Sequence, residues 1–390
     1  MHHIYPDFGS GSLSNFYKIK NVSVHSVLLL PSREEAINYI KGDISLGFCD
    51  QTGFISNLVF DPNLHQYSTG YEATQGFSDT FNSFHRNLAL RLIKQYNLHN
   101  KDLIEIGCGQ GEFLTLLCEL GNNRGVGFDP AFVEARNQSE ARDRLTFVKD
   151  FYSEKYADYH GDFICCKMTL EHIYHTTEFV STVRRSIGNR TNTVVFFQVP
   201  NVRYVLREVA FWDIYYEHCS YFSPGSLARL FRKSGFEVVD LRTDYNDQYL
   251  MIEARPGSGR GRPLPGEETP AQLARDIDHF TEKFQHKMAQ WQETLHHLRQ
   301  SGRRAVIWGG GSKGVSFLTT LQIEDQIEYV VDINPFKHGT FMAGTGQQIV
   351  PPEFLIDYRP DLIIVMNPVY CDEIQRDLNR MGVQADLMPL

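Results

Sequence analysis

The most constraining feature of the sequence is an apolar segment that runs into a cluster of glycines within residues 102–113. The segment places an acid, Glu105, just before Gly107, Gly109 and Gly111, which occupy alternate positions. An apolar pattern with helical spacing follows them. Strand, glycine turn and helix in this order begin a nucleotide-binding crossover unit, in which glycine lets the backbone approach a ligand where a Cβ would collide. The segment therefore predicts an α/β fold with a ligand at this turn.

A second acid, Asp129, lies twenty residues beyond Gly109, at the end of the next predicted strand, where it can reach ribose hydroxyls. The Gly-x-Gly-x-Gly spacing differs from the Gly-x-Gly-x-x-Gly of a pyrophosphate loop. It resembles motif I of the class I methyltransferases, which bind S-adenosylmethionine (SAM). The resemblance implies a Rossmann-like domain with SAM held by Glu105, the three glycines and Asp129. A glycine trio alone would also fit an ordinary strand–helix turn.

Two further candidates for cofactor binding follow the predicted strand at residues 145–148. Methyltransferases of this class often place an acid there against the adenine amino group, and Asp150 occupies the position. Phe151 would supply an apolar contact to the ring. An ordinary surface loop is the alternative for both residues.

The chain divides by composition and periodicity into four parts. We predict a small β-rich N-terminal domain over 1–85, with a strand at 22–30, and a SAM-binding methyltransferase domain over 86–254. A Gly- and Pro-rich linker then leads into a long helix with apolar residues at intervals of three and four, over 255–301. A second Rossmann-like domain covers 302–390. The predicted fold class is α/β throughout, apart from the first part.

The C-terminal part has a glycine fingerprint of its own. Gly309, Gly311 and Gly314 have the Gly-x-Gly-x-x-Gly spacing, and Asp332 follows 21 residues after Gly311. This matches the dinucleotide pattern more closely than the first loop does. No domain for hydride transfer accompanies it, so SAM is the only cofactor that we predict. We expect this loop to pack against the methyltransferase domain or to touch the acceptor.

Composition excludes several classes of partner. A net charge of −9 without a long basic run argues against nucleic acid. No apolar stretch approaches the length of a membrane span, and no signal-peptide core is recognisable at the N-terminus. Seven scattered cysteines without a paired framework suit a reducing cytoplasm, where we expect the protein to reside. The sequence gives no indication of oligomeric state.

The stretch that decides the reaction covers residues 211–222, between the fifth predicted strand and the next helix. It places His218 beside Glu217 and close to Tyr215, among other aromatic residues. A histidine, a carboxylate and tyrosine hydroxyls form a general acid–base assembly by residue type. An aromatic-rich loop with one hydrogen-bonded histidine fits the spacing equally well.

The whole chain resembles the three-domain sugar C-methyltransferases, which add a methyl to carbon 3 of nucleotide-linked 4-keto deoxysugars. That family has Ile-Tyr-His-Glu-His before Ser-Tyr-Phe, and residues 214–222 here read Ile-Tyr-Tyr-Glu-His-Cys-Ser-Tyr-Phe. By position, the resemblance makes His218 the base, assisted by Tyr215 and Glu217, with Tyr71 as a further catalytic candidate. It extends from about Tyr67 to the C-terminus and includes the second glycine loop.

Two departures from the family stand out. The family holds zinc on four N-terminal cysteines, whereas only Cys49 precedes Cys108 here, so we predict no metal site of that type. The first histidine of the family motif is Tyr216, and we expect both departures to affect the acceptor end of the site. An alternative zinc site is less favoured because its cysteines look like part of a buried strand. Its residues would be Cys165, Cys166, His172 and His175.

The expected reaction is SAM-dependent methylation of a carbon next to a ketone. His218 would remove the proton and Tyr215 or Tyr71 would stabilise the enolate. The acceptor would be a small molecule, either a deoxysugar, with a nucleotide-linked one as the candidate, or a related biosynthetic intermediate. Methylation of oxygen or nitrogen on a non-sugar metabolite is the alternative reaction. A binding protein that keeps the SAM fold only as a scaffold is the alternative of a different class.

Overall fold

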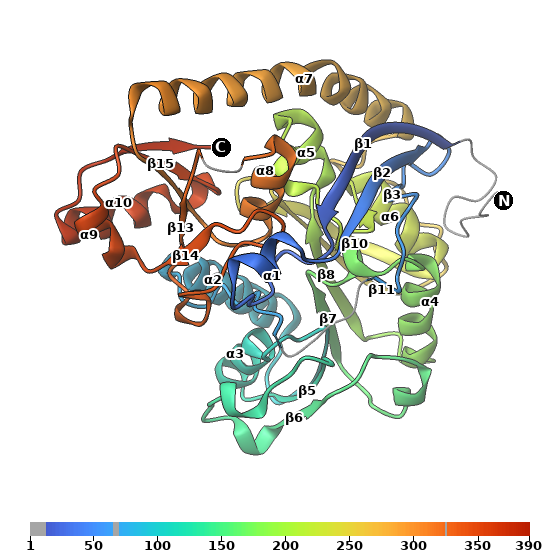
Figure 1. The fold of residues 1–390 in the computed structure, drawn as a ribbon. Helices are drawn as coiled ribbons and strands as arrows, with labels where there is room; N and C mark the ends of the chain where they lie inside the picture. Colours follow the sequence, from blue (N-terminus) through green and yellow to red (C-terminus); the bar gives the residue numbers. More distant parts are fainter. Residues whose placement is uncertain (1–12, 65–69, 324–325) are drawn as a thin grey trace.

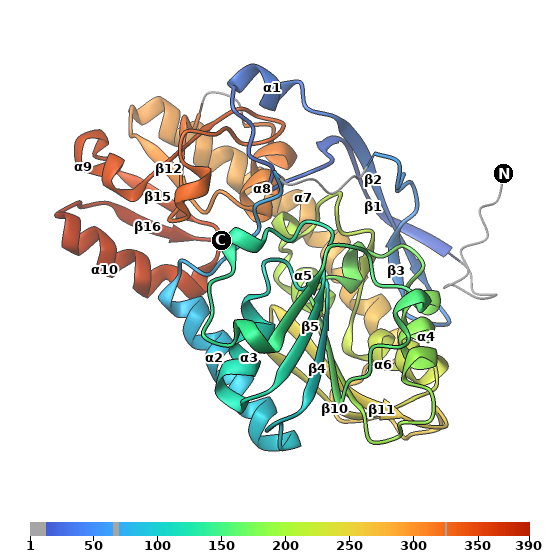
Figure 2. The ribbon, with the colours of Figure 1, turned by 90° about the horizontal axis from the view of Figure 1, so that it is seen from below.

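The computed structural model describes residues 13–64, 70–323 and 326–390, which form three sheets. The central sheet and its helices form the lower part of the molecule in the view of Figure 1. The N-terminal sheet and the C-terminal domain both lie on one side of it, which the view from below also shows (Figure 2). This arrangement leaves a region where all three parts face one another.

The N-terminal sheet has the strand order β1-β2-β3-β9. Its first three strands are β1 (Leu13–Ser23), β2 (Lys41–Cys49) and β3 (Ile55–Asn57), and the short helix α1 (Arg33–Ile37) lies between β1 and β2. The fourth strand, β9 (Ser220–Tyr221), comes from the stretch predicted to decide the reaction and pairs antiparallel with β3. The small domain is therefore completed by a segment distant in sequence.

The predicted strand at residues 22–30 is wrong in its extent. Strand β1 ends at Ser23, and the chain beyond it makes only isolated bridges, from Leu28 to Tyr71 and from Leu30 to Phe341. The apolar residues there are buried against other segments rather than paired in a regular ladder, and apolar runs of this kind do not distinguish the two. This segment carries the N-terminal part towards both Tyr71 and the C-terminal domain.

The central sheet has seven strands in the order β10-β11-β8-β7-β4-β5-β6. Strand β11 pairs antiparallel with both neighbours, and the other pairs are parallel. The strands are β4 (Asp102–Ile106), β5 (Arg124–Phe128), β6 (Leu145–Val148), β7 (Phe163–Lys167), β8 (Val194–Pro200), β10 (Phe236–Asp244) and β11 (Tyr249–Pro256). The helices of this part are α2 (Asp79–Tyr96), α3 (Glu112–Gly121), α4 (Thr176–Ile187), α5 (Val202–Glu208) and α6 (Pro224–Lys233).

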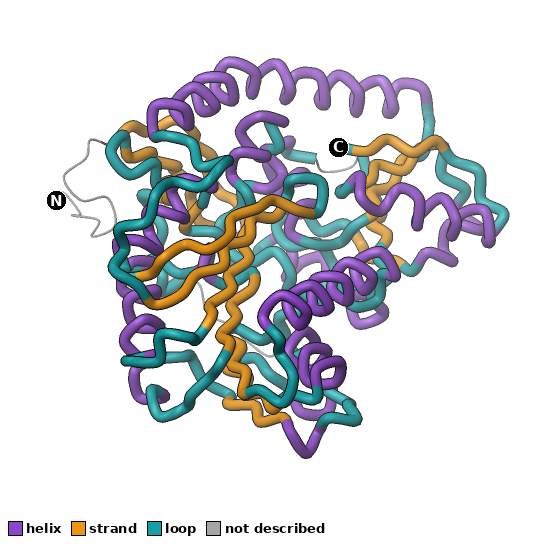
Figure 3. The backbone as a smooth tube through the Cα atoms, turned by 180° about the vertical axis from the view of Figure 1, so that it is seen from behind, coloured by secondary structure: helices purple, strands orange, loops and turns teal. Residues whose placement is uncertain are grey.

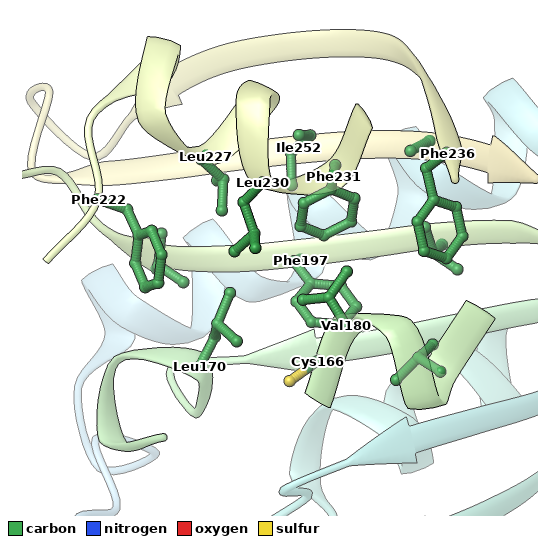
Figure 4. Packing of buried hydrophobic residues seen from close by; sticks show 14 of the residues in the cluster. Cys166, Leu170, Val180, Phe197, Phe222, Leu227, Leu230, Phe231, Phe236 and Ile252 are labelled. Carbon is green, nitrogen blue, oxygen red and sulfur yellow. The ribbon is translucent and has the colours of Figure 1, made fainter. Parts of the chain in front are cut away.

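Helices cover both faces of this sheet and enclose two apolar cores. On one face, helices α4 and α6 pack Val180 and Phe231 against Cys166 and Phe197 of the sheet (Figure 4). On the other face, helices α2 and α3 enclose a second core that includes Cys165. Buried parallel strands with helices on both sides confirm the predicted α/β fold and fix the carboxyl ends of the strands as the place for a ligand.

The C-terminal domain is a parallel five-stranded sheet in the order β14-β13-β12-β15-β16. This confirms the prediction of a second Rossmann-like domain. Its strands are β12 (Ala305–Trp308), β13 (Tyr329–Val331), β14 (Gln348–Val350), β15 (Leu362–Val365) and β16 (Asp386–Pro389). Its helices are α8 (Ser312–Leu321), α9 (Leu355–Tyr358) and α10 (Cys371–Met381).

The long helix α7 (Pro270–Ser301) follows the linker and runs along one edge of the molecule (Figures 1 and 3). Its first half packs Phe280 against the N-terminal sheet, and its second half packs Trp291 against the C-terminal domain. Helix α7 thus joins these two domains, while the proposed boundary between residues 85 and 86 lies inside the continuous helix α2. No helix in the described part of the chain is both long and apolar enough to cross a bilayer.

The core under helix α6 gives a test of the fold. Phe231 is fully buried against Phe197 and Phe236, so Phe231→Ala should lower the free energy of unfolding by about 3–5 kcal/mol. Val239 is 45% exposed, and Val239→Ala serves as the control, with an expected effect within about 0.5 kcal/mol. Urea denaturation followed by circular dichroism measures both. Equal midpoints for the two variants would contradict the packing described here.

Candidate active site

A cavity of 740 Å³ lies where the three parts of the chain meet. The glycine turn after β4 lines it, together with Tyr71, Tyr215, His218 and the second glycine loop at Gly309 and Gly311. Both glycine loops and most of the predicted catalytic residues therefore face one cavity. Its size suits a cofactor and a small acceptor together.

The three glycines of the first turn all have backbone angles that favour glycine, with φ of +68° at Gly107, +55° at Gly109 and +78° at Gly111. A Cβ at Gly107 would collide with Thr169, and one at Gly111 would collide with Phe147. At Gly109 a Cβ would meet no protein atom within 4 Å. The middle glycine thus presents bare backbone to open space, which is what close approach of a ligand requires.

Asp129 follows β5 and braces the same turn. One side-chain oxygen accepts a hydrogen bond from the Gly109 amide at 2.8 Å, and the other accepts from the Ala131 amide at 2.8 Å. Burial raises the pKa of Asp129, and the two amides oppose that rise. Asp129 lines the cavity, so its remaining lone pairs can accept from ribose hydroxyls.

Glu105 lies at the end of β4 and is almost fully buried. Its carboxylate accepts a hydrogen bond at 3.0 Å from the Leu114 amide, in the first turn of helix α3. Burial raises the pKa of Glu105, and the nearby Lys167 ammonium opposes the rise. Glu105 thus joins the strand to the helix, and it also lines the cavity.

Asp150 and Phe151 reach the cavity beyond β6. The Asp150 carboxylate accepts hydrogen bonds from the Lys155 ammonium and from the Tyr156 hydroxyl, the second at 2.6 Å, and these bonds lower the pKa of Asp150 to about 2. The Phe151 side chain is 61% exposed at the cavity edge. Their roles at the adenine stay predictions.

The stretch over residues 211–222 is held by all three parts of the chain. Asp213 forms an ion pair at 2.5 Å with Lys313 at the start of helix α8, and the Ser316 hydroxyl donates to the Ile214 carbonyl at 2.7 Å. On the other side, β9 pairs with β3 of the N-terminal sheet. His218 is thereby fixed above the carboxyl ends of the central strands.

His218 is buried between Tyr215 and Glu171. The Tyr215 and His218 ring centroids lie 4.1 Å apart, and the Nε2 of His218 lies 4.0 Å from a Glu171 oxygen. Glu171 follows β7 in a short 3-10 helix, Leu170–His172, and is only 1% exposed. Burial raises the pKa of Glu171 to about 8, and neither of its side-chain oxygens has a hydrogen-bond partner among the described residues.

Sequence reasoning did not assign a role to Glu171. The signal was present, because Glu171-His172 directly follows a strand of the central sheet, where functional residues gather in open α/β folds. What the sequence did not show is that the later stretch folds back onto it, as the contact from the Cys219 thiol to the Glu171 carbonyl at 3.6 Å shows. Glu171 therefore joins the candidate site.

Glu217 points towards the N-terminal domain. Its carboxylate accepts a hydrogen bond from the Ser26 hydroxyl, which in turn lies 2.7 Å from the Ser312 hydroxyl at the start of helix α8. Burial raises the pKa of Glu217 to about 7, and hydrogen bonds from Ser26 and Tyr71 oppose this. Glu217 and Tyr71 are thus brought together, and their roles in the reaction stay predictions.

The expectation that Tyr216 would affect the acceptor end is wrong. Tyr216 is buried in the N-terminal core beside Gly42, where a Cβ would collide with its ring. Its hydroxyl accepts a hydrogen bond from the Asp61 amide at 2.9 Å. The His218 amide donates to the Tyr215 carbonyl at 3.2 Å and closes a tight turn, and Tyr216 packs into the N-terminal core whereas Tyr215 lines the cavity.

The alternative zinc site on both cysteines does not fit the geometry. Cys165 and Cys166 belong to cores on opposite faces of the central sheet, so the two thiols cannot share one ion. Ligand atoms of Glu171, His172 and His218 do lie within 4.8 Å of one another. The prediction that the protein holds no metal stays untested.

The comparisons with known proteins agree on a methyltransferase. Residues 80–241 match the family model of a methyltransferase domain, and residues 265–385 match the model of a C-methyltransferase C-terminal domain. The chain is also 28% identical over 308 residues to the C-methyltransferase NovU of Streptomyces niveus, an alignment that covers 74% of this chain and 72% of NovU. This chain is a SAM-dependent C-methyltransferase.

Two solved methyltransferase structures resemble part of the C-methyltransferase. The riboflavin-analogue dimethyltransferase RosA of Streptomyces davawensis is 16% identical, with a TM-score of 0.35, and the match covers 45% of this chain and 55% of RosA. The magnesium protoporphyrin IX methyltransferase ChlM of Synechocystis PCC 6803, with bound S-adenosylhomocysteine, is 13% identical, with a TM-score of 0.36. That match covers 46% of this chain and 84% of ChlM.

The position of Asp129 in the C-methyltransferase gives a prediction for cofactor affinity. Asp129→Ala should weaken SAM binding by about 1–3 kcal/mol, because it removes a charged acceptor for the ribose and the brace on Gly109. Titration calorimetry with SAM measures the change. Asp143, whose side chain is 82% exposed, provides the control variant Asp143→Ala. Unchanged SAM affinity in folded Asp129→Ala would rule out the ribose assignment.

The buried Glu171 predicts how stability depends on pH. The folded C-methyltransferase keeps this carboxyl protonated up to about pH 8, whereas an unfolded chain releases the proton near the ordinary value of 4.5. Raising the pH through this window therefore favours unfolding at this group. Glu171→Gln should lose less stability than wild type between about pH 5 and about pH 8.

Urea midpoints measured across that pH range test the Glu171 prediction. Glu134→Gln, at a side chain that is 79% exposed, is the matched control and should follow the wild-type curve. Parallel curves for wild type and Glu171→Gln would show that Glu171 is ionised in the folded protein at neutral pH.

Proposed function

We propose that this C-methyltransferase methylates a carbon next to a ketone, with His218 as the base. The acceptor that we favour is a nucleotide-linked keto-deoxysugar or a related biosynthetic intermediate. The observation that supports this most is the position of His218, which lines the same cavity as the first glycine turn and lies between Tyr215 and Glu171. Forming and methylating an enolate needs a base, a hydroxyl donor and a cofactor-binding site close together. His218, Tyr215 and the first glycine turn all line this one cavity.

The environment of each residue determines its proposed role in the reaction. SAM, when bound at the first turn, supplies an electrophilic methyl group on its sulfonium. His218 takes the proton from the acceptor carbon, and the hydroxyl of Tyr215 or Tyr71 donates a hydrogen bond to the enolate oxygen. A neutral Glu171 leaves no ion pair to keep His218 protonated beforehand. Holding the reacting carbon in line with the methyl group supplies much of the rate.

The C-terminal domain provides the support for a nucleotide on the acceptor. Gly309, Gly311 and Ser312 line the same cavity as His218, at the N-terminus of the ten-residue helix α8. Such a terminus favours phosphate groups through its free amides and its dipole. The Asp332 carboxylate accepts hydrogen bonds from the Gly310 amide at 2.9 Å and from the Lys337 ammonium at 3.1 Å. We therefore assign this loop to the acceptor rather than to a second cofactor.

Proton exchange tests the mechanism directly. A nucleoside-diphosphate-linked 4-keto deoxysugar is incubated in deuterated buffer with the enzyme and a non-reactive SAM analogue. The proton on the carbon to be methylated should exchange, and His218→Gln should reduce both exchange and methylation by about 10²- to 10⁴-fold while leaving SAM affinity unchanged. Glu217→Gln should slow both steps less, because that residue acts through its neighbours.

The control is His160→Gln, at an exposed histidine outside the cavity, which should behave as wild type. Full methylation by His218→Gln would remove this residue from the mechanism. A product with its methyl on oxygen or nitrogen, without exchange at carbon, would establish heteroatom methylation instead.

A further inference from the structure

One cation at the cavity has no role in the chemistry described so far. Four lysine or arginine side chains line the cavity, and three of them form ion pairs. These pairs are Arg136 with Glu72 at 2.7 Å, Lys313 with Asp213 at 2.5 Å and Lys337 with Asp332 at 3.1 Å. The fourth cation is Lys167, at the end of β7, and no carboxylate of the described residues lies within ion-pair distance of it.

Neutral groups hold the Lys167 ammonium in place. It donates a hydrogen bond at 2.8 Å to the Nε2 of His85, and it lies 3.8 Å from the centre of the Phe113 ring. Burial and the nearby lysine lower the pKa of His85 to about 2, so His85 is the neutral acceptor of this bond. Lys167 itself is only 9% exposed, and burial lowers the pKa of its ammonium to about 8, although Glu105 opposes this shift. Burying a cation without an anion in direct contact is costly.

The order of the strands shows which part of SAM would reach Lys167. The carboxyl ends of β6, β5, β4 and β7 lie side by side in that order. If the adenine lies at Asp150 and the ribose at Asp129, the methionine tail continues over the turn after β4 to the end of β7. That tail carries one ammonium and one carboxylate, and Lys167 is the cation at its end.

We propose that Lys167, held by His85, binds the α-carboxylate of the methionine part of SAM. The α-carboxylate supplies an anion in direct contact with the ammonium, whereas Glu105 and Glu112 act on Lys167 only from beyond ion-pair distance, and His85 keeps the ammonium directed at the cavity. Glu105 and Glu112 also line this end of the cavity, so the ammonium of the tail has acids of opposite charge nearby. Lys167 is thus a cofactor-binding residue that selects an intact amino-acid tail.

Decarboxylated SAM, which lacks only this carboxylate, separates the proposal from a general effect on binding. Calorimetry on the full chain should show that wild type prefers SAM to decarboxylated SAM. Lys167→Met should weaken SAM by roughly 10- to 100-fold and leave decarboxylated SAM within about twofold, which abolishes the preference. Lys167→Arg should restore part of it, because it keeps the charge. His85→Leu should reduce the preference less than Lys167→Met does.

Lys94→Met removes an exposed cation of helix α2 that does not line the cavity and is the control, with the preference for SAM expected to stay at the wild-type value. Equal losses for both cofactors in Lys167→Met, or no loss for either, would overturn the proposal. Melting curves confirm that each variant is folded. The measurement needs no acceptor, so its outcome is independent of the proposed reaction at His218.

Discussion

The arrangement of the site depends on how the stretch over residues 211–222 is held. Its start is tied to the C-terminal domain by the ion pair between Asp213 and Lys313, at 2.5 Å. Its end pairs with the N-terminal sheet through β9, directly after His218. Between these two anchors the backbone has little freedom, so the histidine has a defined position above the central sheet. Without either neighbouring domain this stretch would be a loop anchored only at its own two ends.

Polar contacts reinforce this dependence at the point where the three parts meet. The chain of contacts from Glu217 to Ser26 to Ser312 passes from the stretch over residues 211–222 through the N-terminal segment to helix α8. The bond to Glu217 forms only when the N-terminal segment is docked, and the contact between Ser26 and Ser312 forms only when helix α8 is docked as well. An unsatisfied buried carboxylate is costly. The same contacts that complete the cavity therefore also favour the docked arrangement, which links the formation of the site to the assembly of the domains.

The sequence predicted those parts of the site whose residues are close together in the chain. It did not predict the parts that depend on contacts between distant segments. The glycine turn with Glu105 and Asp129 was predictable because strand, turn and helix are consecutive, and each glycine meets a requirement of its own backbone. Glu171 and Lys167 were not predictable from the sequence. The role of Glu171 depends on contact with a stretch 48 residues later in the chain. Lys167 looked like the last residue of a strand, and only the fold shows that no carboxylate of the described residues lies within ion-pair distance of its ammonium. Tyr216 was misplaced for the same reason, since its neighbour Tyr215 faces the opposite side.

Tyr216 also helps to anchor the N-terminal sheet to the rest of the chain. A small domain with few strands buries little apolar surface and usually needs a metal or disulfide. Here the sheet packs onto residues from elsewhere in the chain, namely Tyr216 and Tyr221 from the stretch over residues 211–222 and Leu273 and Phe280 from helix α7. Aromatic burial against the other domains anchors this sheet to the rest of the chain. The residue that departs from the family motif is then the one that fixes the N-terminal domain beside the cavity.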